Sequence, residues 1–295
     1  MYDINNTAII LLFCLFLQCS TPKEIDKNDC TTKYPIVFVH GVAYRDDVPI
    51  IKYWSNIPKI IEENGGKVYL SNQNAFNSHS DNAIQIKEKI LEILNETKSD
   101  KVNIIAHSKG GIEARYMITK LEMADKVASL TTLSTPHRGS SMADTIVAFL
   151  DKKNLTKRIH RLANFYAKLI GDNNPNAIES ARNLTVDYMK DFNKSVPNMP
   201  QVYYQSYGSI VNDNYPSWIV KVQHEIMQKA EGDNDCVVSS YSYKWGDFKG
   251  IVKSNEAYGI SHFDIVGMKF VSKSSSFDAE MFVYKIVKDL KKKGY

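Results

Sequence analysis

The chain has 295 residues, of which 43% are hydrophobic and 24% are charged, and its formal net charge is +4. A chain of this length and composition can bury one large core or two modest ones, which fits a single catalytic domain with an elaborated insert. The positive charge is mild, and the lysines are dispersed apart from Lys291 to Lys293 near the end. The composition therefore argues against a nucleic-acid partner.

The first residues differ sharply in composition from the rest. Residues 8–17 form an unbroken apolar run that is too short to span a bilayer but matches the core of a signal peptide, although residues 1–6 contain no Lys or Arg. We expect residues 1–19 to be a signal peptide and residues 20–33 a polar tether, so that the protein is exported. Cys19 resembles the lipidated cysteine of a bacterial lipoprotein, and the alternatives are envelope anchoring through Cys19 or cleavage nearby with secretion.

The four cysteines allow at most one disulfide in the exported chain. Cys14 would leave with the signal peptide, and Cys19 would become the anchor or be lost. Cys30 and Cys236 would then remain, and an exported protein offers them an oxidising environment. The sequence leaves open whether they pair. No group of cysteines and histidines has the spacing of a zinc finger.

Short apolar runs alternate with amphipathic helical patterns along most of the chain. The runs predict strands at 35–39, 67–70, 102–106, 127–133 and 201–207. The helical patterns cover 53–64, 81–94, 110–121 and 279–293. This alternation predicts an α/β protein with a mostly parallel central sheet flanked by helices, as in the α/β-hydrolase fold.

The alternation is interrupted between about residues 140 and 200. The stretch begins with an apolar helical stripe, continues through the basic residues 152–161, and then presents a second stripe that includes Leu162, Phe165 and Leu169. An insert of this length between strands is more often functional than idle. We expect a helical lid or cap within one catalytic domain over residues 34–295, and a mobile lid and a fixed cap both remain open.

Ser108 lies directly between the third predicted strand and the following helix. A nucleophile elbow requires this strand–turn–helix context, with small residues two positions before and after the serine. Ala106 replaces the glycine that is usual at the first of these positions, and Gly110 occupies the second. The helix amino terminus favours negative charge at the serine oxygen. We predict that Ser108 is a nucleophile, and the alternative is a serine that only caps the helix.

Acyl transfer from such a serine needs two donors for the tetrahedral oxyanion. One is the backbone N–H of the residue after the nucleophile, Lys109. The other comes from the loop after the first strand, where we expect the backbone N–H of Val42. Only backbone is required at both positions. His40, in the same loop, is interpreted as a loop-orienting residue rather than a base.

The order serine, acid, histidine along an α/β-hydrolase chain restricts the remaining catalytic candidates. Of seven histidines, His262 follows a loop late in the chain, whereas His224 lies inside a predicted helix. The acid should precede His262 in a loop, where it can fix the imidazole tautomer. We favour Asp235, which abuts a short apolar run; Asp233 is the second choice and Asp247 a more distant one.

Taken together, these motifs resemble the bacterial true lipases, namely the Pseudomonas and Burkholderia group and the related clostridial and bacillar triacylglycerol lipases. The resemblance is carried by collinear segments at 34–41, 67–70, 101–111, 129–140, 234–239 and 261–264. The most specific is Ser-Thr-Pro-His-Arg-Gly-Ser at 134–140. The resemblance implies hydrolysis of water-insoluble carboxylic esters at a lipid–water interface, with Ser108, Asp235 and His262 as triad, Val42 and Lys109 as oxyanion donors, and no cofactor in the chemistry.

The chain departs from the family pattern at two positions beside the site. Lys109 stands where many relatives have Gln, which is harmless to a backbone donor, and Cys236 replaces the glycine after the acid. The resemblance also implies a structural calcium ion between Asp213 and Asp264, whose oxygens suit a hard cation. A turn at Asp213 is the alternative. The zinc-binding insert of the bacillar branch is absent from the sequence.

Two other functions remain open on these residues. The same triad would serve an esterase for short soluble esters, phospholipids or polyesters. A non-catalytic envelope lipoprotein could retain the scaffold alone, but the presence of Ser108, Asp235 and His262 argues against that function.

Overall fold

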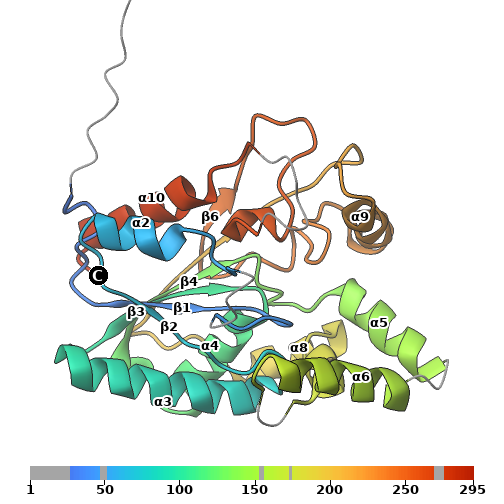
Figure 1. Cartoon of the computed structure of the whole chain (residues 1–295), viewed down its shortest axis with the longest axis horizontal. Coiled ribbons are helices and arrows are strands. Elements are labelled where there is room, and N and C mark those ends of the chain that lie inside the picture. Colours follow the sequence, from blue (N-terminus) through green and yellow to red (C-terminus); the bar gives the residue numbers. More distant parts are fainter. Residues whose placement is uncertain (1–26, 47–51, 153–155, 173–174, 269–275) are drawn as a thin grey trace, which may run out of the picture.

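The computed structural model describes residues 27–46, 52–152, 156–172, 175–268 and 276–295 (Figure 1). The predicted signal peptide, Cys14 and Cys19 lie outside these residues. No helix in the described ranges is both long enough and apolar enough to traverse a bilayer.

One parallel sheet forms the centre of the molecule. Its strands are β1 (Ile36–Val39), β2 (Val68–Leu70), β3 (Val102–His107), β4 (Val127–Leu133), β5 (Tyr203–Gly208) and β6 (Asp247–Ile251). Their order is β2-β1-β3-β4-β5-β6, and every neighbouring pair is parallel. Strands β1, β3 and β4 are buried along their whole length, which explains their continuous apolar sequences. The sheet confirms the predicted fold class.

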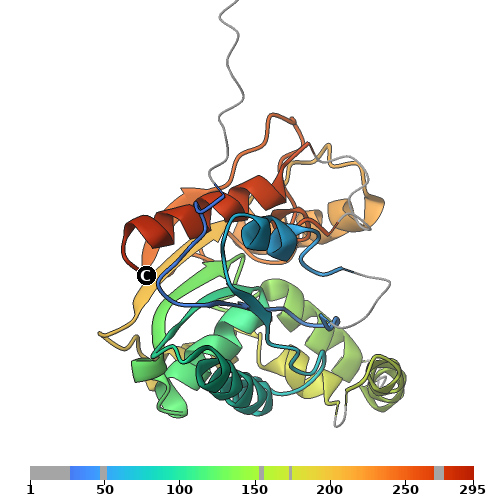
Figure 2. The same cartoon turned by 60° about the vertical axis from the view of Figure 1, so that its left-hand side comes forward.

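Helices cover both faces of this sheet, as Figures 1 and 2 show. On one face lie α2 (Ile57–Glu63) and α10 (Ala279–Lys292), which share an apolar core with β1. On the other lie α3 (His79–Thr97) and α4 (Lys109–Lys120), packed against the opposite side chains of β1 and β3. The two cores leave the carboxyl ends of the strands free for the loops that carry Ser108 and its partners.

The described part of the segment between β4 and β5 contains four helices. These are α5 (Ser141–Lys152), α6 (Thr156–Leu169), α7 (Ala177–Arg182) and α8 (Val186–Ser195), and a further helix, α9 (Trp218–Glu231), lies between β5 and β6. The short 3-10 helices η1 (Ala124–Lys126) and η2 (Asp264–Val266) complete the described elements. The end of α6 is attached to the body through Asp172, whose carboxylate accepts hydrogen bonds from the backbone N–H groups of Ala75 and Phe76, each at 2.8 Å.

Cys30 and Cys236 are both free and buried. Cys30 belongs to the core beneath α2 and α10, whereas Cys236 belongs to a separate apolar cluster with Val211 and Tyr215. The possible disulfide is therefore not formed. Burial raises the pKa of the Cys30 thiol to about 11, which keeps it protonated at neutral pH.

Candidate active site

Ser108 occupies a sharp turn between β3 and α4. Its φ of 54° and ψ of −132° lie in a region that a non-glycine residue rarely adopts. Tight packing around the turn requires small neighbours, because a Cβ on Gly110 would lie 2.4 Å from the His40 carbonyl oxygen. The Ser108 side chain does not cap α4. It faces His262 instead, which removes the helix-capping alternative.

The structure brings Ser108, His262 and Asp235 into one hydrogen-bonded chain. The Ser108 hydroxyl oxygen lies 2.9 Å from Nε2 of His262, and Nδ1 of His262 lies 3.0 Å from Oδ2 of Asp235. The second oxygen of Asp235 accepts the backbone N–H groups of Val237 and Val238, at 3.0 and 2.7 Å. With its carboxylate fixed in this way, Asp235 favours the tautomer in which Nδ1 of His262 carries the proton and Nε2 can accept one from Ser108.

The other acid and base candidates lie elsewhere. Asp233 is exposed, and Asp247 on β6 accepts a hydrogen bond from the Tyr203 hydroxyl at 2.7 Å. The His224 ring is 3.0 Å from the side-chain oxygen of Asn234 and 3.3 Å from Asp213. None of these contacts includes Ser108.

Cys236 adopts a left-handed backbone conformation directly after Asp235. Its φ is 82°, a value that favours glycine, so the loss of the family's glycine noted in the sequence introduces strain at this position. The Cys236 N–H donates to the side-chain oxygen of Asn234 at 2.8 Å, and the Asp235 carbonyl accepts the His262 N–H at 2.8 Å. These bonds hold the strained turn and join the acid loop to the histidine loop.

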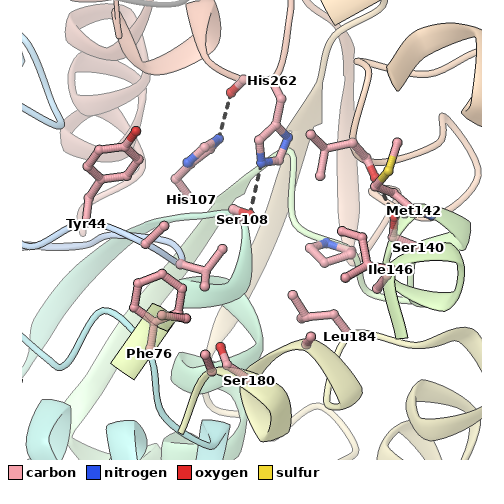
Figure 3. A pocket seen from close by; sticks show the side chains of 18 of the residues that line it. Tyr44, Phe76, His107, Ser108, Ser140, Met142, Ile146, Ser180, Leu184 and His262 are labelled. Carbon is pink, nitrogen blue, oxygen red and sulfur yellow. Dashed lines mark hydrogen bonds between the residues drawn. The ribbon is translucent and has the colours of Figure 1, made fainter. Parts of the chain in front are cut away.

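A second chain of buried groups, which no sequence pattern indicated, supports His262 from behind. The Tyr53 hydroxyl accepts the Gly41 N–H at 2.8 Å and donates to Nδ1 of His107 at 2.5 Å. Nε2 of His107 then donates to the His262 carbonyl oxygen at 3.0 Å (Figure 3). Burial, with a smaller effect from His262, holds the pKa of His107 well below its usual range. A neutral His107 with its proton on Nε2 satisfies both bonds.

The two predicted oxyanion donors are available for a ligand. In the loop after β1, the Gly41 N–H is engaged by Tyr53, and the Ala43 N–H donates to the Ala75 carbonyl at 3.1 Å. Within the described ranges, the Val42 and Lys109 N–H groups donate to no other residue. Val42 also lines the cavity beside Ser108. Its N–H is therefore free to donate to a ligand in that cavity.

The Lys109 side chain has a structural role that the sequence did not reveal. It is 1% exposed and forms a buried ion pair with Glu113, one turn further along α4. Glu113 also accepts hydrogen bonds from the side chains of Gln73, at 3.0 Å, and Asn82, at 2.7 Å. Because the same Gln73 amide donates to the His40 carbonyl at 2.9 Å, this network joins the start of α4 to the Val42 loop.

The His40 ring joins this network by contacting backbone carbonyl oxygens. Its ring nitrogens lie 2.7 Å from the Gly41 carbonyl and 3.0 Å from the Gln73 carbonyl, so the ring orients the loop, as predicted from the sequence, and does not contact Ser108.

A cavity of about 480 Å³ opens beside Ser108. This volume lies in the range of about 300–1,000 Å³ that is typical of small-ligand sites. Figure 3 shows Ser108 and His262 on one side of it and apolar side chains on the other. The apolar lining includes Phe76, Met142, Ala143, Ile146, Leu150, Ile159, Ala163, Ile178, Ala181, Leu184, Val237, Phe263 and Met268. Most of these residues come from α5, α6 and α7, so the insert supplies the apolar wall.

The structure does not confirm the calcium ion that the resemblance implied between Asp213 and Asp264. Oδ2 of Asp264 accepts three hydrogen bonds, from the Tyr215 hydroxyl at 2.6 Å and from the N–H and hydroxyl of Ser261, each at 2.8 Å. These donors already stabilise the carboxylate, and Asp213 faces His224 instead. Among the described residues, no three His, Cys, Asp or Glu side chains are grouped to hold a metal ion. Asp264 instead fixes the turn that carries His262.

Comparison with known proteins places these observations in a family. The family model for palmitoyl protein thioesterase matches residues 35–274. Triacylglycerol lipase 2 of Saccharomyces cerevisiae is 29% identical over 83% of this chain and 75% of its own length. Triacylglycerol lipases of Pseudarthrobacter phenanthrenivorans and Burkholderia plantarii are each 32% identical over 57% of this chain, but the match spans only 55% and 49% of their lengths. The predicted relation to lipases is confirmed.

Solved structures show the same fold. The Staphylococcus hyicus lipase superposes with a TM-score of 0.66 at 17% identity, covering 92% of this chain and 98% of that one. A metagenomic carboxyl esterase superposes with a TM-score of 0.68 at 16% identity, covering 89% and 77%. At these identities the likeness concerns the fold alone.

Proposed function

Because the chain belongs to the palmitoyl protein thioesterase family and is a hydrolase, we propose that it is a triacylglycerol lipase that acts through an acyl-enzyme on Ser108. The observation that carries the proposal is the hydrogen-bonded chain Ser108–His262–Asp235 at the edge of a largely apolar cavity. The Ser108 hydroxyl oxygen therefore lies beside both the polar groups that acyl transfer needs and an apolar wall that can hold an acyl chain.

In the acylation step, the Ser108 oxygen attacks the ester carbonyl carbon while its proton passes to Nε2 of His262. Asp235 stabilises the imidazolium that forms, and the N–H groups of Val42 and Lys109 bind the tetrahedral oxyanion. The intermediate collapses by breaking the bond to the alcohol oxygen, which takes the proton from His262. The products of this step are the free alcohol and the acyl-enzyme.

Deacylation repeats the sequence with water. His262 removes a proton from the water as the water oxygen attacks the acyl carbonyl, and the proton is then returned to the Ser108 oxygen as the fatty acid leaves. The chemistry uses the side chains and backbone of this chain alone.

The helical insert at about 140–200 is proposed to be the lid or cap of the acyl cavity and to meet a lipid–water interface. The support is the cavity wall that α5 and α6 supply, together with their exposed apolar side chains, such as Phe149 and Leu162. Residues 1–19 are proposed to direct export, with release or anchoring through Cys19. Mass measurement of the mature amino terminus tests this, because a lipid-modified Cys19 and an unmodified new terminus differ in mass.

Substrate profiling tests the lipase assignment against the esterase alternative. Initial rates are measured on emulsified triacylglycerols and on soluble esters over a series of acyl lengths, with Ser108→Ala as the background. The proposal expects Ser108-dependent hydrolysis that is fastest on emulsified long-chain substrate. Activity confined to soluble short-chain esters would replace the lipase assignment with an esterase, and absence of Ser108-dependent hydrolysis on every substrate would refute both.

A further inference from the structure

Helix α6 exposes an apolar stripe to solvent along one side. Its exposed apolar side chains include Leu162, Phe165 and Leu169, which are 67%, 61% and 69% exposed. Over residues 157–169 of the helix, Ala167 is the only buried side chain, although Ile159 and Ala163 reach the cavity. A soluble helix normally turns such a stripe toward a core, so this one is built to meet something outside the chain.

The stripe is continuous with the cavity beside Ser108. Ile146 on α5 and Ile159 on α6 both line that cavity and are also 45% and 39% exposed, so they form its rim. In both Figures 1 and 2, α6 lies at the outer margin of the molecule, away from α2 and α10. A partner seated on α6 would therefore lie against the entrance through which an acyl chain reaches Ser108.

The polar side of α6 is strongly basic. The helix carries Lys157, Arg158, Arg161 and Lys168, all exposed, and contains no Asp or Glu. The nearest carboxylates on either side are engaged: Asp151 pairs with Arg182 at 3.5 Å, and Asp172 binds backbone N–H groups. Among the described residues, no carboxylate forms an ion pair with these four cations, which can therefore attract an external anion.

Helix α9 shows that exposed apolar residues on this protein are not always accompanied by positive charge. It exposes Trp218, Ile219 and Val222, at 73%, 46% and 49%. Its charged residues, however, balance: Lys221 and Lys229 are offset by Glu225 and Glu231. The four uncompensated positive charges of α6 are therefore specific to that helix and are not shared by α9.

We propose that α6 is the docking surface for an anionic phospholipid membrane. Its apolar stripe enters the boundary between headgroups and acyl chains, and its four cations contact the lipid phosphates, which is the arrangement of interfacial amphipathic helices. This deepens the proposed function, on which it rests, because it names the helix of the insert that binds the lipid surface and the charge of the lipids that it binds. It also selects the kind of surface, since a zwitterionic membrane or a neutral oil droplet offers the cations no net negative charge.

The test compares two variants that remove the same charge. The α6 variant is Lys157→Gln/Arg158→Gln/Arg161→Gln. The matched control is Lys98→Gln/Lys120→Gln/Lys126→Gln. These three exposed lysines lie near the amino ends of β3 and β4, whereas Ser108 lies at the carboxyl end of β3. Each lowers the formal net charge from +4 to +1, that is 4 − 3. All proteins are full chains that carry Ser108→Ala and Cys19→Ser, so neither turnover nor lipid attachment at Cys19 contributes to binding.

Partitioning is measured by co-sedimentation with vesicles of phosphatidylcholine and with mixed vesicles of phosphatidylcholine and phosphatidylglycerol. On the mixed vesicles we expect the α6 variant to bind more weakly than the control by about fivefold for each cation removed, or on the order of a hundredfold for three. On phosphatidylcholine alone the two should bind alike. Added salt should weaken binding of the control to the mixed vesicles much more than that of the α6 variant.

Three results would overturn the proposal. The first is equal binding of the α6 variant and the control to the mixed vesicles, which would assign the attraction to overall charge. The second is unchanged binding when the apolar stripe is removed by Leu162→Ser/Phe165→Ser/Leu169→Ser. The third is a dimer in sedimentation velocity that this stripe variant dissociates, with no vesicle binding by the parent, which would make a second copy the occupant. Failure of the proposed lipase activity would be detected separately, because the protein that retains Ser108 would then show no Ser108-dependent hydrolysis.

Discussion

The groups around Ser108 and helix α6, which covers them, differ in how deeply they are buried. Asp235 and His262 are buried, and each is fixed by several hydrogen bonds to backbone or side chains. Helix α6, by contrast, has few buried side chains and exposes Leu162 and Leu169 to solvent. The catalytic groups therefore lie on buried, hydrogen-bonded elements at the carboxyl ends of the strands, whereas α6 is an element with little burial.

After loss of Ser108 itself, the largest expected effect comes from breaking the catalytic side of this comparison at Asp235. Asp235→Asn removes the charge that stabilises the imidazolium and the acceptor that sets the His262 tautomer, so kcat should fall on the order of 10⁴-fold. The matched control is Asp233→Asn, which changes the exposed second choice two residues earlier. Steady-state kinetics on one ester measure both. An equal loss in the two variants would transfer the assignment away from Asp235.

The buried ion pair Lys109–Glu113 should affect stability more than any surface pair. Glu113→Leu leaves the Lys109 ammonium buried without its partner, which should lower the free energy of unfolding by about 3–5 kcal/mol. Lys109→Met/Glu113→Leu removes both charges and should recover part of that loss. Urea unfolding measures the three proteins. A double variant no more stable than Glu113→Leu would show that the unpaired charge is not the cause.

The buried histidines make the catalytic side sensitive to acid. Burial, with smaller contributions from His262 for one and Arg115 for the other, lowers the pKa of His107 and of His137. As the pH falls below about 6.5, the unfolded chain binds protons that these rings in the folded chain do not. Stability should therefore fall with decreasing pH, by at most about 1.4 kcal/mol per pH unit for each histidine. His107→Asn should make this slope shallower. Unfolding measurements between about pH 7 and about pH 5, which span the titration of a free histidine, test this. An unchanged slope would exclude His107 as a contributor.

The smallest effect is expected on the covering side. Leu162→Ser should change the free energy of unfolding by no more than about 0.5 kcal/mol, because its side chain is already 67% exposed. Ile105→Ala on β3, whose side chain is fully buried, should cost about 2–5 kcal/mol. Thermal and urea unfolding compare the two. A large loss for Leu162→Ser would mean that α6 packs more tightly than its exposure indicates.

The sequence predicted those parts of the fold that local patterns specify. Strands β1, β3 and β4 and the Ser108 elbow were visible because buried parallel strands are continuous apolar runs and the elbow needs small residues at fixed offsets. Strand β6 was missed, since the half-exposed pattern of Asp247–Ile251 at the edge of the sheet lacks such a run. The triad order along the chain, together with the apolar run that follows Asp235, favoured Asp235 and His262 over Asp233 and His224.

Contacts between distant residues were beyond reach of the sequence. Tyr53 and His107 are 54 residues apart, and neither carries a signal that they support His262. Lys109 and Glu113 have the spacing of a common surface pair, so their burial could not be foreseen. The expected calcium ion is not confirmed, and no sequence pattern could foresee that Tyr215, 49 residues before Asp264, donates to the carboxylate that was expected to bind it.

Covalent labelling of the active serine tests the central claim most directly. The parent protein and Ser108→Ala are treated with a fluorophosphonate, digested and mapped by mass spectrometry, and ester hydrolysis is followed in parallel. The account predicts that the label lies on Ser108 in the parent and is absent from Ser108→Ala, whose kcat falls on the order of 10⁶-fold while its melting temperature is retained. Labelling at another residue, or hydrolysis by Ser108→Ala at the parental rate, would contradict it.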